Sequence, residues 1–170
     1  LGLLGSRYRS LTAGLTEKMA HIGFGLPGIV VGLSLVFAAI RIIPVLYQTW
    51  FVLILGYVVL FLALATGPVR AGFERASRNV DEAARTLGAG PWLRFRRLTI
   101  PVLKPGIVGA FVLVFISTSK ELPCTLLLAP AGTHTLSTRV WQYTEEAMYA
   151  EASVPALVLI LISTFLVTIL

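Results

Sequence analysis

The stretch EAARTLGAGPWLRFRRLTIPVLKP, residues 82–105, is a charged interruption between long apolar runs. Residues 75–87 overlap the beginning of this stretch. Over this range, small and apolar residues recur at helical spacing, while charged residues occupy the opposite face. A glycine-rich turn at 88–90 and a proline at position 91 follow, and these residues commonly end one helix and begin the next. The stretch therefore predicts two short helices joined by a turn, a helix-turn-helix whose second helix extends to about Leu98.

The composition around this stretch is that of a membrane protein. Of 170 residues, 56% are hydrophobic and 13% are charged, and the mean hydropathy is +0.86, well above the range of soluble domains. Apolar runs close to the length of about 20 residues that a helix needs to cross a bilayer recur along the chain, so we expect an all-α, polytopic transmembrane helix bundle in contact with lipid. The net charge is +6, but no platform of interleaved basic and aromatic residues accompanies it, so the sequence does not predict nucleic-acid binding.

The apolar runs divide the chain into about four spans, since a bilayer core of about 30 Å takes about 20 helical residues. We place the spans at about residues 25–43, 47–65, 105–128 and 154–170. The basic loop 66–104 is predicted to be cytoplasmic, because Lys and Arg concentrate on that side, and the acidic loop 129–153 is predicted to be periplasmic. The last apolar run stops with the chain, and we expect the sequence to be a fragment of a longer protein.

No arrangement of residues in the sequence predicts catalysis. The single cysteine, Cys124, is far in sequence from His21 and His134, so no metal-ligand spacing is present and no metal or other cofactor is expected. The spans hold no paired carboxylates, no HExxH and no Ser/His arrangement, and the chain has no phosphate-binding GxxxxGK[ST] loop. An intramembrane enzyme is therefore disfavoured.

The central stretch resembles the EAA signature of ABC-importer permeases, which is written EAA, three residues, G, nine residues, I-x-L-P. The spacing is met in full, with Leu98 in place of Ile and Ile100 in place of Leu. The matching positions are Glu82, Ala83, Ala84, Gly88, Leu98, Ile100 and Pro101. The resemblance implies the fold of a type I importer permease: one transmembrane domain, multi-pass in the bacterial inner membrane.

The same resemblance implies that these residues couple the chain to a cytoplasmic ABC ATPase, and that the chain itself is a non-catalytic subunit. It further implies a second permease half, fused or separate, and a periplasmic substrate-binding protein as partners. Two alternatives remain for the basic stretch: it could bind anionic headgroups as an amphipathic hairpin with Glu82 as a surface charge, or the chain could be a membrane anchor or scaffold.

Other segments resemble the C-terminal half of ferric-iron permeases. These are GLPGIVV at 25–31, KELP at 120–123 with TLLL at 125–128, and TRVW at 138–141. The resemblance implies ferric iron as the cargo. Permeases for thiamine, polyamines or sulfate share the signature and are the alternatives.

A polar group near the end of the third span is the candidate pathway. Ser117, Ser119, Lys120 and Glu121 precede Pro123, which can break the helix. A charged side chain inside a span costs about 2.5–3.5 kcal/mol on insertion scales, so Lys120 and Glu121 predict a functional site. Glu121 could meet a cation as a hard oxygen ligand, with Lys120 limiting its stay. Alternatively, the pair could reach outward to the interface or pin two spans together.

Overall fold

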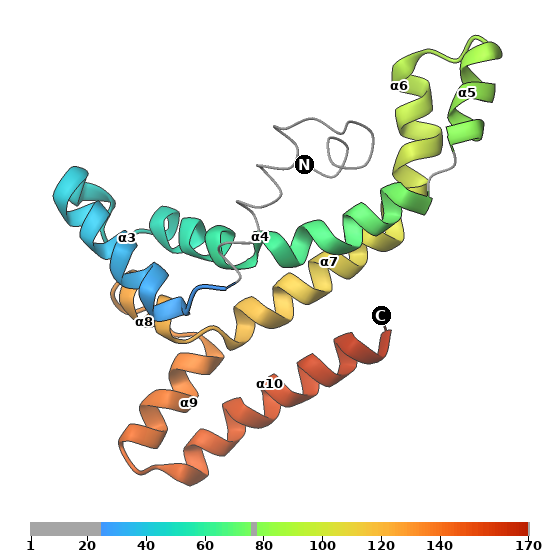
Figure 1. The fold of residues 1–170 in the computed structure, drawn as a ribbon. Helices are drawn as coiled ribbons and strands as arrows, with labels where there is room; N and C mark the ends of the chain where they lie inside the picture. The colour runs from blue at the N-terminus through green and yellow to red at the C-terminus, as the bar shows by residue number, and fades with distance from the viewer. Residues whose placement is uncertain (1–24, 76–77, 170) are drawn as a thin grey trace.

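The computed structural model describes residues 25–75 and 78–169, and all regular elements in that part of the chain are helices (Figure 1). In chain order they are α3 (Gly28–Ile42), the 3-10 turn η1 (Pro44–Leu46), α4 (Trp50–Arg75), α5 (Arg78–Thr86), α6 (Pro91–Arg94), the π-helical segment η2 (Phe95–Thr99), α7 (Ile100–Lys120), α8 (Pro123–Leu128), α9 (Leu136–Glu145) and α10 (Tyr149–Ile169). The predicted all-α class is confirmed.

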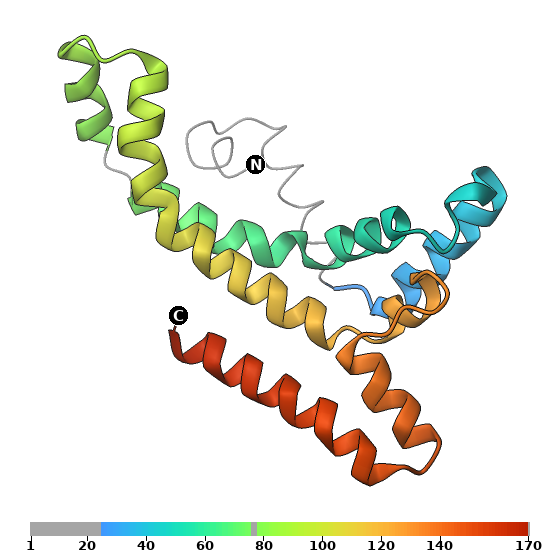
Figure 2. The ribbon, with the colours of Figure 1, turned by 180° about the vertical axis from the view of Figure 1, so that it is seen from behind.

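The long helices α4 and α7 run antiparallel and side by side, and α5 and α6 form a hairpin that projects beyond their shared end (Figures 1 and 2). Small residues allow this close approach. A Cβ placed on Gly106 of α7 would lie 2.5 Å from the backbone oxygen of Pro68 in α4, and one placed on Gly72 would lie 3.1 Å from Leu103 Cδ2. Glycine at the contact thus lets the two backbones meet, as is common between membrane helices.

The short helix α8 packs between α3 and the first half of α4. Cys124 and Leu128 are completely buried there. A Cβ on Gly56 of α4 would lie 2.8 Å from Cys124 Sγ, and one on Gly32 of α3 would lie 2.8 Å from Leu127 Cδ1, so both neighbouring helices present glycine to α8. The resulting core cluster consists of Val31, Val52, Leu53, Leu60, Cys124 and Leu128.

Within the described residues, three helical stretches are long and apolar enough to cross a membrane: Trp50–Glu74, Pro91–Lys120 and Tyr149–Thr168. They correspond to three of the predicted spans. The remaining predicted span, at about residues 25–43, contains α3. This helix has 15 residues, or about 22 Å at 1.5 Å per residue, which is less than a full crossing. The position of these helices in a bilayer stays a prediction.

Two helices extend beyond the predicted membrane spans. Helix α4 continues past residue 65 to Arg75 and contains Pro68, while α10 begins at Tyr149 rather than at 154 and contains Pro155. Hydropathy falls at both places, but the backbone hydrogen bonding continues, so apolar composition underestimates the helix length.

The predicted third span, 105–128, is divided by a break in the helix. Helix α7 ends at Lys120, Glu121 is extended with ψ 122°, and α8 starts at Pro123. Proline cannot donate a backbone hydrogen bond and its ring collides with the preceding turn, so the helix ends before it. The polar stretch that the sequence singled out lies at this break.

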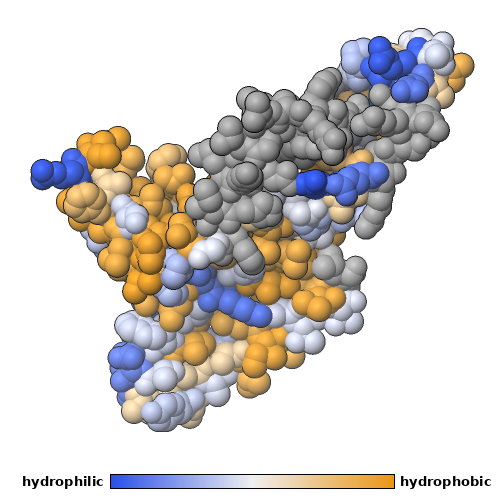
Figure 3. Space-filling model, viewed as in Figure 1, coloured by the Kyte–Doolittle hydropathy of each residue, from blue (hydrophilic) through white to orange (hydrophobic). Residues whose placement is uncertain are grey.

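Apolar side chains cover much of the outside of the bundle, as the orange areas of Figure 3 show. Phe37, Phe111 and Phe165 are 71%, 67% and 65% exposed. An exterior of this kind in a bundle of apolar helices faces lipid or other apolar helices.

Candidate functional site

The turn of the α5–α6 hairpin is closed by a defined hydrogen-bond pattern. Gly88 N donates to Arg85 O at 3.0 Å and Ala89 N donates to Ala84 O at 3.0 Å, the two bonds of a Schellman motif. Gly88 has φ +77°, a left-handed conformation that side chains disfavour. The glycine of the EAA-like stretch is therefore required by the backbone of this turn.

The tip of the hairpin exposes both charged and apolar groups. Glu82 and Ala83 are exposed, Ala84 is half-buried, and Leu87 and Trp92 are 87% and 72% exposed. Large apolar side chains on a polar projection are typical of a surface that binds another protein. The small and apolar residues predicted to share one helix face over residues 75–87 also include Ala76 and Val80. Ala76 and the side chain of Val80 lie outside the described part of the chain.

The second helix of the hairpin does not end near Leu98 as predicted. Helix α6 continues through the π-helical segment into α7 without a loop, and Ile100 N donates to Phe95 O. Pro101 has no N–H to donate to the preceding turn, which accounts for the local rearrangement. Leu98 is half-buried, whereas Ile100 and Pro101 are exposed, and all three lie where the hairpin joins α7.

At the other end of α7, Glu121 connects several elements. Its Oε1 accepts a hydrogen bond from Cys124 N at 2.9 Å, and its backbone oxygen accepts one from Thr125 Oγ1 at 2.8 Å and one from Ser137 Oγ at 3.1 Å. Thr125 Oγ1 also lies 2.6 Å from the Tyr57 hydroxyl of α4. Glu121 thus links α8 and α9, and Thr125 of α8 extends these contacts to α4.

The Glu121 carboxylate also lies against the start of α3, because a Cβ on Gly28 would overlap Glu121 Oε1. Gly28 is the first residue of α3, and Cys124 is the second residue of α8. The positive ends of two helices therefore face one carboxylate, an arrangement that stabilises its charge. This geometry favours the alternative in which Glu121 pins parts of the bundle together.

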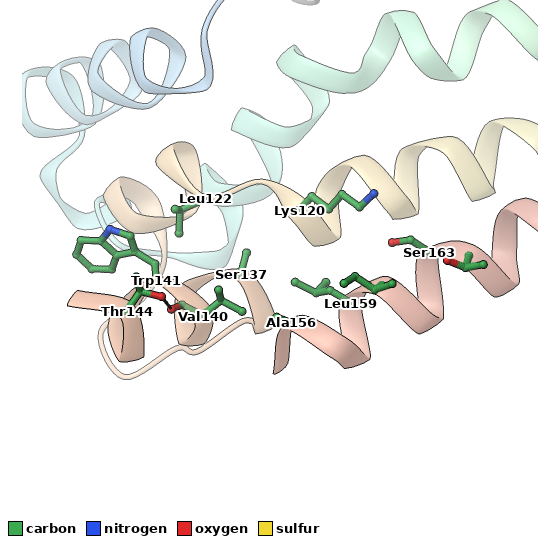
Figure 4. Close-up of a pocket in the computed structure, with 11 residues that line it drawn as sticks. Lys120, Leu122, Ser137, Val140, Trp141, Thr144, Ala156, Leu159 and Ser163 are labelled. Carbon is green, nitrogen blue, oxygen red and sulfur yellow. Dashed lines mark hydrogen bonds between the residues drawn. The ribbon is translucent and has the colours of Figure 1, made fainter. Parts of the chain in front are cut away.

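Lys120 points elsewhere, into a groove of about 600 Å³ shown in Figure 4. The groove lies between the end of α7, α9 and α10. Its lining consists of Lys120, Leu122, Ser137, Val140, Trp141, Thr144, Ala156, Leu159, Ile160, Ser163 and Thr164. Sequence reasoning found Lys120 but missed the residues of α9 and α10, because nothing in their local pattern shows that they meet it.

The two predicted pathway serines lie in the last turns of α7 and are half-buried. Ser119 Oγ donates to Phe115 O at 2.7 Å within its own helix, and neither Ser117 nor Ser119 is among the residues that line the groove. Across the described residues, no cluster of three or more His, Cys, Asp or Glu side chains could hold a metal ion.

These features define a multi-pass helical membrane protein that presents a polar helical hairpin beyond one end of its spans. Comparison with known sequences then places it: the chain belongs to the family described as binding-protein-dependent transport system inner membrane component, whose sequence profile matches residues 1–170. Members of this family are transport permeases of the inner membrane rather than enzymes. The predicted family and localisation are confirmed.

Several named relatives are similar to most or part of the chain. The Fe(3+)-transport system permease protein FbpB 2 of Haemophilus influenzae is 41% identical over 157 residues, which cover 92% of this chain and 31% of that protein. The putative 2-aminoethylphosphonate transport system permease protein PhnV of Salmonella paratyphi A is 29% identical, covering 89% and 58%. The molybdenum transport system permease protein ModB of Azotobacter vinelandii is 30% identical, covering 59% and 46%. The chain thus spans less than two thirds of each of these relatives.

Proposed function

We propose that this chain is the part of an ABC-importer permease that couples a cytoplasmic ATPase to substrate passage, and that the cargo is ferric iron. The observation that carries the coupling role is the α5–α6 hairpin, which holds the EAA-like residues on a projection with exposed Glu82, Leu87 and Trp92. A second permease half, ATPase subunits and a periplasmic substrate-binding protein complete the proposed transporter.

The continuity of α6 with α7 supports a mechanical role for the hairpin. Force applied to the hairpin by a closing ATPase dimer passes into α7 with no flexible loop between them. Helix α7 carries that movement to its other end, where Lys120 and Glu121 lie at the break. The hairpin would thus drive rearrangement of the helix ends around the groove.

The substitution Gly88→Asp tests the coupling role. It places a side chain on a left-handed residue, which costs about 1 kcal/mol or more and disturbs the turn. We expect the full-length variant to reach the membrane but to lose substrate uptake and the stimulation of ATP hydrolysis by loaded binding protein.

A matched control is Gly132→Asp. Gly132 has φ +80°, and a Cβ added there would have no neighbouring atom within 4 Å, as at Gly88, but Gly132 lies between α8 and α9. Equal loss of uptake in both variants, or normal uptake by Gly88→Asp, refutes the coupling role. A membrane anchor would also fail to copurify with an ATPase.

Support for ferric iron comes from the 41% identity to an Fe(3+) permease over most of this chain. The test is uptake of radioactive ferric iron by a host that lacks its own ferric transporters and expresses the full-length permease with its ATPase and binding protein. Uptake of 2-aminoethylphosphonate, molybdate, thiamine, a polyamine or sulfate in place of iron would reassign the cargo and leave the coupling role standing.

A further inference from the structure

The groove beside the break combines an apolar lining with a single charged side chain. Its lining comes from three regions of the chain: Lys120 at the end of α7 with Leu122 in the break before α8, Trp141 and its neighbours on α9, and Ser163 and its neighbours on α10. Most of that lining is apolar. In Figure 4 the amino group of Lys120 extends along the groove toward the end where Ser163 lies.

Among the described residues, no carboxylate forms an ion pair with Lys120. The adjacent carboxylate, Glu121, is turned toward Cys124 and the start of α3 instead. Lys120 is exposed at the edge of this apolar lining, and a charged side chain in apolar surroundings is costly unless water or an opposite charge offsets its desolvation. The charge in the groove is therefore available for an anion.

Hydroxyl groups in the groove extend this polar surface. Ser163 is buried. Within the described part of the chain, the hydroxyls of Ser163 and Thr164 form no hydrogen bond to another side chain or to the backbone. Hydroxyls can donate to the oxygens of an anionic group, as the lysine ammonium can. A bare metal cation would instead meet a positive charge and, among the residues described, no cluster of acidic ligands.

We infer that the groove binds an anionic, oxygen-bearing group of the cargo, with Lys120 as its counter-charge. The inference rests on the proposed transport function and narrows the chemical class of the substrate. For iron, it means that ferric ion passes as a complex whose outer surface carries carboxylate or phosphate oxygens, rather than as a bare cation. A phosphonate presents the same kind of group.

Charge-removing and charge-retaining variants test this in the full transporter. Loss of a hydrogen bond to a charged group reduces binding about tenfold or more, so we expect Lys120→Gln to lower uptake of ferric citrate about tenfold at equal membrane level. Lys120→Arg keeps the charge and should keep most of the uptake. Arg41→Gln removes an exposed positive charge outside the groove and should behave as wild type.

A second measurement uses the purified full-length wild-type transporter and needs no variant. Ferric citrate, and in a separate arm methylphosphonate, which has no amine to consume the reagent, should slow acetylation of Lys120 by an amine-reactive reagent, while Lys104 near the start of α7 is acetylated at an unchanged rate. Protection by one arm alone identifies which anion the groove accepts.

The inference is overturned if Lys120→Gln takes up ferric citrate at the wild-type rate or faster, if Lys120→Arg loses as much as Lys120→Gln, or if neither anion protects Lys120. These outcomes are distinct from failure of the proposed function. If the proposed function fails, the wild-type transporter itself imports no iron, or Gly88→Asp still couples ATP hydrolysis to uptake.

Discussion

The substitution Gly106→Ala tests the packing of α4 against α7. The added Cβ would lie 2.5 Å from the Pro68 oxygen, 3.2 Å from the Pro68 carbonyl carbon and 3.4 Å from Val69 Cα. All three are backbone atoms of a helix, so no side-chain rotation can relieve the overlap, and the two helices must separate. Overpacking of this kind typically costs about 1–3 kcal/mol.

The matched control is Gly72→Ala, in the same helix pair. Its Cβ would meet Leu103 Cδ2 at 3.1 Å, and this contact is with the end of a side chain, which can rotate away, rather than with backbone. Both substitutions gain about 1 kcal/mol of helix propensity, so the difference between them reports the contact alone. In thermal unfolding of the full-length protein in detergent, the midpoint temperature of Gly106→Ala should be about 2–12 °C below that of Gly72→Ala. Equal midpoints would refute the close α4–α7 contact.

Three further substitutions test the junction at Glu121. Glu121→Gln keeps an acceptor for Cys124 N but removes the charge that faces the starts of α3 and α8, so we expect a stability loss of about 0.3–2 kcal/mol with uptake retained at equal membrane level; lost uptake at unchanged stability would instead give Glu121 a pathway role. Tyr57→Phe removes the 2.6 Å contact to Thr125 and should cost about 0.6 kcal/mol in thermal unfolding, less than Thr125→Val, which also removes the bond to the Glu121 carbonyl. A larger effect of Tyr57→Phe than of Thr125→Val would contradict this arrangement.

The α5–α6 hairpin was predictable because its signals are local. The glycine at position 88 occupies the left-handed residue of a Schellman motif, and Pro91 stands in the first turn of α6, as their sequence positions indicate. Continuity of α6 with α7 was not predictable, since a proline at 101 suggests an interruption and the chain instead adopts a π-helical segment.

The break in the third predicted span shows the limit of hydropathy. Residues 105–128 are apolar enough to read as one span, yet α7 stops at Lys120 and α8 packs back between α3 and α4. Gly32 and Gly56 make room for α8. Both glycines are far from α8 in sequence, so local sequence patterns cannot predict this contact.

Local sequence signals were enough to predict the helical membrane class and the basic hairpin, because hydropathy, helix period and capping act over a few neighbouring residues. The pathway role of the polar residues near the end of the third apolar run stays a prediction. The separate roles of the neighbours Lys120 and Glu121 depend instead on tertiary packing. The backbone turns between them, so Glu121 faces the starts of α3 and α8 while Lys120 faces the groove with α9 and α10. The groups that these two side chains face lie as far apart in sequence as Gly28 and Thr164, and only tertiary packing brings them together.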